Sequence, residues 1–275
     1  MHLMVWAIAA LFAAQPQGAA VPQPGAAAQP GAVAQPAAVA QPAGELSADA
    51  SVDQVLDALH LRGQNLQSFD AKVTLTESDV NTALESTRSG VVRYQKKPDA
   101  SERIRVVFDK KVDGQRVFDE KIEYMLDGQW LIDRDYNKRI EVRRQVLKPG
   151  EKTNLLKLGE GPFPLPIGQK KEDVKKLFNV TKVKPAKDDP PGTIHLMLKA
   201  IPGTQFARKF SEIGVWVDAK THMPRKITTL DPKGTKEVGT DLSDFRPNAA
   251  LKDADFKLEP VPPDKWRTHE EQFRE

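Results

Sequence analysis

The first folded element that the sequence indicates is a helix just after residue 50. Apolar residues recur there at spacings of three and four, which places them in one stripe: Val52, Val55, Leu56 and Leu59. Ser51 and Gln54 form a capping-box pattern at the start of this stripe. Gly63 and Asn65 are typical of a helix end, so the helix should stop near residue 65.

After this helix the apolar period changes from 3.6 to 2. Apolar and polar residues alternate near residues 69–75, 91–95, 103–108, 122–126, 130–132 and 139–143. Such alternation is typical of strands that are covered on one face. Short turns at Asp127-Gly128 and Tyr136-Asn137 join neighbouring segments, so we expect an antiparallel meander.

The middle of the chain interrupts this rhythm. Residues 153–159 indicate a short helix, residues 161–168 form an apolar loop with three prolines, and residues 172–178 indicate another helical turn. Alternation resumes near residues 180–183, 194–198, 213–217, 227–229, 238–242 and 256–258. We therefore predict an α+β domain at residues 48–263, with about eleven strands in an antiparallel sheet and a few helices. Residues 264–275 form a polar C-terminal tail.

A sheet of this size must cover its apolar face, and the helical segments available for this are few. They can serve as a lid over a curved sheet, which predicts a concave, incompletely filled apolar interior. Such interiors hold apolar ligands. An ordinary α+β core gives the same pattern, so that alternative stays open.

The first 44 residues contain no Lys, Arg, Asp or Glu. Leu3–Ala14 is an apolar run of 12 residues, shorter than the ~20 residues of a membrane-spanning helix. It fits the core of a secretory signal peptide at residues 1–20, although an uncleaved anchor stays open because basic residues are missing before it. Residues 21–47 carry a proline every six residues and have no aromatic residue, which predicts a disordered linker.

Composition removes several classes of function. The chain has no cysteine, which excludes disulfides, thiolate metal sites and a cysteine nucleophile. Its formal net charge of +3 gives no broad electrostatic case for nucleic acid. A mean hydropathy of −0.50 excludes a polytopic membrane protein.

Sequence motifs for catalysis are missing as well. The five histidines form no metal-binding spacing, and the chain has no GxSxG, Walker or GxGxxG motif. We therefore expect neither an enzyme nor a cofactor. Basic pairs such as Lys110-Lys111 alternate with acidic residues, which is typical of solvated turns. A rim for anionic headgroups is the alternative.

The order of several short motifs resembles the outer-membrane lipoprotein carrier (LolA-like) family. The matching segments are LQSFDA at 66–71, SGVVRYQKKP at 89–98, DGQWLI at 127–132, MPRKI at 223–227, DPKG at 231–234 and DFKL at 255–258. They span about residues 50–263. Each motif is short, so the resemblance lies in the ordered set.

The resemblance implies a half-barrel closed by helices that carries acyl chains between membranes. Residues expected to line its apolar cavity are Val73, Leu75, Val92, Tyr94, Ile104, Val106, Phe108, Ile122, Tyr124, Trp130, Ile132, Val142, Leu196, Leu198, Val215 and Val217. For Tyr124 and Trp130, a core role is the alternative to ligand contact. Expected lid residues are Leu56, Leu59, Leu155 and Leu158. Lys97 stands where the family uses an arginine to hold its lid, and it is the candidate latch.

We therefore expect an exported, periplasmic, monomeric protein that binds lipids or lipoprotein acyl chains and does not bind nucleic acid. Retention by an uncleaved N-terminal segment is a second possibility for its location. Acceptor proteins in the inner or outer membrane are candidate partners. The alternative is an envelope sensor or interaction module that uses the same fold to bind a protein partner. Polar substitution at Val106 or Ile122 should weaken the binding of a hydrophobic dye if the cavity exists.

Overall fold

The structure is a computed structural model that describes residues 44–148, 151, 155–156 and 167–273. The predicted signal peptide, most of the predicted linker, most of the helix predicted at 153–159 and most of the proline-containing loop lie outside the described residues. Within them, the helices are α2 (Val52–Asn65) and α3 (Lys171–Leu177), with 3₁₀ turns η1 (Phe206–Arg208) and η2 (Asp253–Phe256).

Twelve strands of the described chain form one sheet. The strands are β1 (Ser68–Asp79), β2 (Leu84–Lys96), β3 (Glu102–Asp113), β4 (Arg116–Asp127), β5 (Trp130–Asp135), β6 (Ile140–Gln145), β7 (Phe178–Lys182), β8 (Thr193–Ala200), β9 (Glu212–Asp218), β10 (Pro224–Leu230), β11 (Lys236–Pro247) and β12 (Arg267–Glu271). Their order is β12-β6-β5-β4-β3-β2-β1-β11-β10-β9-β8-β7. All neighbours pair antiparallel except β12 with β6.

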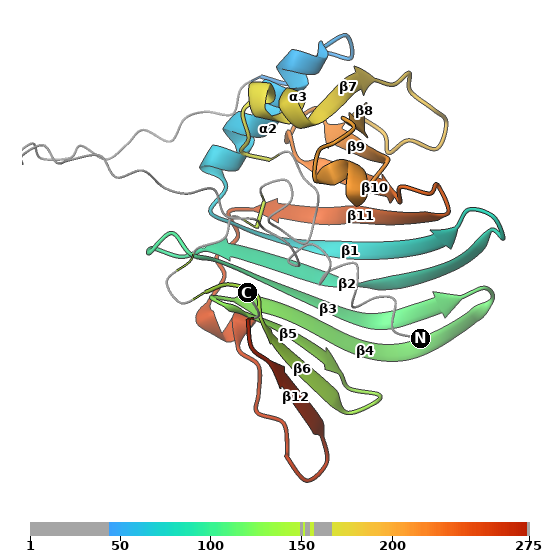
Figure 1. Ribbon diagram of the computed structural model, residues 1–275. Helices are drawn as coiled ribbons and strands as arrows, with labels where there is room; N and C mark the ends of the chain where they lie inside the picture. Colours follow the sequence, from blue (N-terminus) through green and yellow to red (C-terminus); the bar gives the residue numbers. More distant parts are fainter. Residues whose placement is uncertain (1–43, 149–150, 152–154, 157–166, 274–275) are drawn as a thin grey trace, which may run out of the picture.

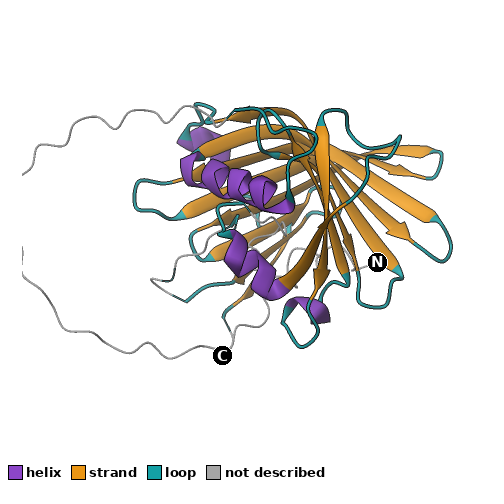
Figure 2. Ribbon diagram, turned by 90° about the horizontal axis from the view of Figure 1, so that it is seen from above, coloured by secondary structure: helices purple, strands orange, loops and turns teal. Residues whose placement is uncertain are grey.

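The sheet is open, because β12 and β7 at its two ends do not pair with each other, and it curves into a half-barrel (Figures 1 and 2). The predicted α+β class and single curved antiparallel sheet are confirmed. β1 pairs with β11 and so joins the meander β1–β6 to the second group, β7–β11. We call the face that carries the buried apolar side chains the inner face and the opposite one the outer face.

Helix α2 begins as its sequence predicts. The Ser51 side chain accepts a hydrogen bond from the Gln54 backbone N–H at 3.3 Å, and the Gln54 side chain accepts one from the Ser51 N–H at 2.7 Å. Its buried residues Val55, Leu56 and Leu59 belong to the same core cluster as the inner face of the sheet. Helices α2 and α3 contact each other and β7, so the second group of strands has helical cover.

Two predictions near the C-terminus are wrong. The strand expected at residues 256–258 is replaced by the 3₁₀ turn η2, because Phe256 packs under the side chain of Arg103 on the outer face instead of joining a ladder. Residues 264–275, expected only as a polar tail, contain β12. The sheet therefore continues past residue 263.

Candidate functional site

The inner face of β1–β4 is a continuous apolar surface. The register places Val92 beside Val106, Val106 beside Tyr124, and Phe108 beside Ile122, so their side chains lie on one face. Eight of the expected lining residues are buried here: Val73, Val92, Tyr94, Ile104, Val106, Phe108, Ile122 and Tyr124. None exposes more than 6% of its surface. The first half of the sheet thus has the apolar face that an acyl chain would need.

The other expected lining residues divide into three groups. Leu196, Leu198, Val215 and Val217 are fully buried on β8 and β9, and they belong to the same core cluster as Val174 of α3. Leu75 and Val142 are half-buried on the inner face, at its margins.

Trp130 and Ile132 lie on the outer face, so the expectation that they share a surface with Tyr124 is wrong. The two-residue turn Gly128-Gln129 pairs Asp127 with Trp130, which places Ile132 opposite Met125. Leu131 therefore faces inward instead, and it is 3% exposed. The guanidinium of Arg143 lies 5.7 Å from the ring centre of Trp130 on the outer face.

Several apolar residues from outside the sheet are buried in the same core cluster as its inner face, and we call them the covering residues. Leu56 and Leu59 of α2, two of the expected lid residues, are buried in its core cluster. Leu155, the third, is buried as well, together with its neighbours in the cluster, Leu156 and Ile167. Leu158 lies outside the described residues. The covering residues thus come from α2 and from the chain between β6 and α3.

A close backbone contact joins these two parts of the cover. The N–H of Gly168 donates to the carbonyl of Leu59 at 3.2 Å, and the His60 Nδ1 lies 2.9 Å from the carbonyl oxygen of Gly168. Gly63 allows this approach, since a Cβ at that position would lie 2.2 Å from the Gly168 nitrogen. The residues just after the proline-containing loop are therefore fixed to α2.

Glu102 of β3 ties the covering residues to the sheet. It is 6% exposed, and its carboxylate accepts a hydrogen bond from the backbone N–H of Leu155. Burial raises the pKa of Tyr94, and the charge of the Glu102 carboxylate with its hydrogen bond to the Tyr94 hydroxyl raises it further. Glu102 therefore holds one group on the sheet and one in the cover, as a latch would.

Among the described contacts, Lys97 does not join the covering residues to the sheet. Its ammonium group forms an ion pair with Asp127, at the turn between β4 and β5. The sequence offered a signal for Glu102 that the prediction did not use. Glu102 is in phase with Ile104 and Val106, so it is a carboxylate at a position where the alternation calls for an apolar side chain.

Charged side chains bound the apolar surface at two other margins. Arg88, in register with Leu75, has an 11% exposed side chain and lies 2.7 Å from Glu120 and 3.4 Å from Glu77. These three side chains form a charged band, which separates the apolar surface from the hairpin ends of β1–β4. Sequence reasoning missed Arg88 because only apolar residues were traced along the inner face.

Asp133 bounds the apolar surface on the side of β5, where it faces Tyr124. Burial raises the pKa of Asp133 to about 6, and the nearby Arg144 opposes that rise. Burial also raises the pKa of Tyr124, and the charge of Asp133 adds to the effect. The buried carboxyl group is therefore partly protonated near pH 6.

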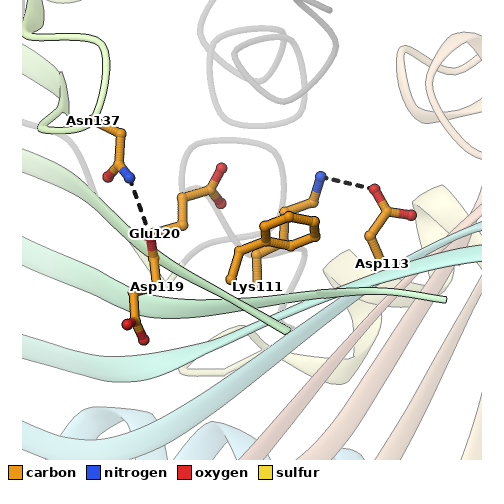
Figure 3. A pocket seen from close by; sticks show the side chains of 6 residues that line it. Lys111, Asp113, Asp119, Glu120 and Asn137 are labelled. Atoms are coloured by element: carbon orange, nitrogen blue, oxygen red, sulfur yellow. Dashed lines mark hydrogen bonds and ion pairs between the residues drawn. The ribbon is translucent and has the colours of Figure 1, made fainter. Parts of the chain in front are cut away.

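A pocket in the described part of the chain lies beyond the charged band of Arg88, near the hairpin end of β3 and β4 (Figure 3). Its volume is about 240 Å³, and it is lined by Lys111, Asp113, Phe118, Asp119, Glu120 and Asn137. The polar groups satisfy each other: Lys111 pairs with Asp113 at 3.2 Å, and the Asn137 amide donates to the Asp119 carbonyl at 3.1 Å. This open, polar hollow differs in character from the apolar inner face.

Exposed apolar side chains gather at the same hairpin ends. Six large apolar residues are exposed in the described chain, and four of them belong to the adjacent β1–β2 and β3–β4 hairpins: Val80, Leu84, Val117 and Phe118. The right-hand ends of both hairpins lie side by side in Figure 1. The half-barrel thus exposes large apolar side chains where the long strands turn.

The described residues contain no group of three or more side chains placed to hold a metal ion. None of the described helices has the length and apolar character needed to cross a bilayer. His195 lies on the outer face, where its ring stacks on that of Trp216 at 3.8 Å between centroids, and burial lowers its pKa.

No protein-family model matches the chain, and no curated protein sequence is significantly similar to it. Among solved structures, it is similar to a LolA superfamily protein from Nitrosomonas europaea, with 12% identity and a TM-score of 0.33 over 74% of this chain and 97% of that one. Solved structures similar to this chain thus include a member of the superfamily that its sequence resembles.

Two further solved structures are similar. LprF from Mycobacterium bovis shares 13% identity, with a TM-score of 0.41 over 76% of this chain and 97% of that chain. The MucA/MucB complex of Pseudomonas aeruginosa shares 13% identity, with a TM-score of 0.42 over 76% of this chain and 67% of the matched chain. Because each of these TM-scores is below 0.5, the functional conclusions rest on the chain's own residues.

Proposed function

We propose that this protein is a non-enzymatic, periplasmic binder or carrier of lipids or lipoprotein acyl chains, which it holds against the inner face of β1–β4. The observation that carries the proposal is the continuous apolar surface on these strands, bounded by Glu102, Arg88 and Asp133. The apolar N-terminal run and the resemblance of the ordered motifs to the lipoprotein carrier family support export and this class of ligand.

The free energies of ligand binding and of the covering residues are of similar size. An acyl chain of ~15 methylenes gains ~12 kcal/mol when it leaves water. The five covering side chains of Leu56, Leu59, Leu155, Leu156 and Ile167 gain about 1.5–3 kcal/mol each on burial, or roughly 7–15 kcal/mol together. The net binding free energy of a ligand that displaces them is therefore only the difference between these two values. A small net free energy permits release of the ligand.

A pair of isoleucines provides the test. Ile122 faces inward and is 6% exposed, whereas Ile132 lies on the outer face of the adjoining strand. Ile122→Ser should weaken the binding of the fluorescent probe N-phenyl-1-naphthylamine by at least about tenfold, because an isoleucine contributes roughly 1.5–3 kcal/mol of apolar contact. Ile132→Ser should leave the affinity within about twofold. Circular dichroism verifies that both variants are folded at the assay temperature.

A folded Ile122→Ser variant with unchanged probe affinity would exclude the inner face as the binding surface. If instead the unchanged protein binds no probe, the alternative function is favoured: an envelope sensor or interaction module with a packed interior that binds a protein partner. The observation that favours this alternative is the low exposure of the inner face, whose buried lining residues expose at most 6% of their surface. Such a module should bind no probe in either variant or in the unchanged protein.

A further inference from the structure

The C-terminal strand β12 is joined to the edge of the sheet by polar contacts. It is the one parallel strand of the described sheet and pairs with β6 from Arg267 to Glu271. The N–H of Arg267 donates to the carbonyl of Arg139 at 3.0 Å. Figure 1 shows β12, in dark red, at the lower end of the sheet. Without this strand, β6 would be the edge of the meander.

The side chains of β12 contribute no apolar burial. Its sequence is RTHEE, and its first four residues are exposed. Arg144 of β6 lies 2.9 Å from Glu271, and Arg143 lies 3.9 Å from Glu270, with both glutamate side chains more than two-fifths exposed. Because both glutamate carboxylates are this exposed, each pair contributes about 0–1 kcal/mol. β12 should therefore open locally at a small free energy.

The segment before β12 is held far more firmly. Arg103 stacks on the ring of Phe256 at 4.2 Å, and Arg105 donates to the carbonyl of Asp255 at 2.7 Å. Farther along, Arg134 donates to the carbonyl of Glu259 at 3.0 Å. These arginines fasten the chain across the outer face, so β12 can leave β6 while the segment before it stays in place.

Arg144 also has unused hydrogen-bonding capacity. Its Nη1 is buried but forms no hydrogen bond with the described residues. The nearest carboxylate oxygen recorded for this nitrogen, on Asp133, lies 4.0 Å away. A carboxylate placed on the β6 edge would meet a donor that β12 leaves unsatisfied.

We propose that the edge of β6 is a docking site for an extended segment of a partner protein, and that β12 occupies this site when the partner is absent. An open edge offers a row of backbone donors and acceptors to which such a segment adds as a strand. The adjacent Arg143 and Arg144 select a segment with two consecutive carboxylates, as Glu270 and Glu271 show. This site lies at the edge of the sheet and does not depend on lipid binding.

The test opens the edge within the full-length protein. The N–H of Arg267 points to β6, and residues two apart on a strand point the same way, so His269 also donates to the ladder. His269→Pro removes this donor and should release β12. His269→Ala keeps the donor and is the matched control. The probe is a fluorescein-labelled peptide with the sequence of residues 264–273, followed by fluorescence anisotropy.

His269→Pro should bind this peptide at least about tenfold more tightly than His269→Ala or the unchanged protein, whose edges are occupied. A peptide with glutamine in place of both glutamates should bind about fivefold more weakly, as the loss of such ion pairs predicts. In the unchanged protein, hydrogen exchange of the β12 amides should be at least about tenfold faster than exchange of the β3 amides.

Three results would overturn the proposal. One is a folded His269→Pro variant that binds the peptide no better than His269→Ala. Another is β12 exchange as slow as that of β3. The third is a dimer of the unchanged protein, seen by light scattering, in which β12 is exchanged between two copies. If His269→Pro does not fold, the exposed double substitution Glu270→Lys with Glu271→Lys replaces it, with the same expected gain in peptide binding.

Discussion

Glu102→Ala removes the carboxylate that joins the covering residues to the sheet. In the folded protein this carboxylate accepts the backbone N–H of Leu155, a residue with 0% exposure. In the substituted protein the covered state leaves that N–H buried and unpaired, whereas in the open state water satisfies it. The substitution therefore shifts the balance toward the open state, to which an apolar ligand binds.

The size of this shift follows from the cost of an unpaired donor. A buried N–H without an acceptor costs about 1–3 kcal/mol. This corresponds to a change of roughly 5- to 150-fold in the equilibrium between the covered and open states. While the open state is a minor population, the apparent dissociation constant of a ligand falls by the same factor. Tyr94 loses its partner in both states, so its contribution largely cancels.

Titration with N-phenyl-1-naphthylamine measures the effect, with Lys97→Ala as the matched control. Lys97 pairs with Asp127, and both side chains are less than one-third exposed at a turn beside the site. Its removal should leave the probe affinity within about twofold, while Glu102→Ala tightens binding at least about fivefold. Thermal unfolding, followed by circular dichroism, verifies that both variants are folded.

Two outcomes refute this reasoning. If folded Glu102→Ala binds the probe no more tightly than the unchanged protein, the Leu155 contact does not hold the cover closed. If Lys97→Ala tightens binding and Glu102→Ala does not, the latch is Lys97, as the sequence suggested.

Three further substitutions test the surroundings of the site. The pKa of Asp133 in the folded protein, about 6, lies above its ordinary value of 3.8, so the folded protein binds more protons than the unfolded chain between these values. The free energy of unfolding then falls by up to about 3 kcal/mol as pH rises from about 4 to about 6. Asp133→Asn should remove this fall, and urea unfolding at pH 4 and pH 7 measures it. An equal pH dependence in the variant would contradict this assignment. Gly63→Ala should lower the free energy of unfolding by about 1–3 kcal/mol, because its methyl group would collide with Gly168; a change below about 0.5 kcal/mol in urea would mean that this contact is not tight. Ser51→Ala should cost about 1 kcal/mol through loss of the α2 cap, and an unchanged thermal midpoint would show that the cap is dispensable.

The sequence predicted the phase of the long strands because apolar alternation continues through them. Ile104, Val106 and Phe108 face inward as their spacing indicates. The face of β5 could not be predicted in the same way, since both Leu131 and Ile132 are apolar. The position of the two-residue turn decides between them, and a shift of one residue exchanges the two faces.

The charged inner residues escaped prediction for a different reason. Arg88, Glu102 and Asp133 occupy inward positions that the apolar pattern treats as gaps, and their partners come from other strands or from the cover. β12 has no apolar pattern to detect, because it is added at an edge through backbone hydrogen bonds. Such features follow from register and long-range contacts that local alternation does not encode.

Native mass spectrometry combined with lipid analysis, on protein purified from the cell envelope without detergent, tests the central claim most directly. The proposed function predicts a diacyl or triacyl species bound in stoichiometric amount to the unchanged protein and lost from Ile122→Ser. A ligand-free mass for the unchanged protein, together with no binding of N-phenyl-1-naphthylamine, would contradict lipid binding on the inner face.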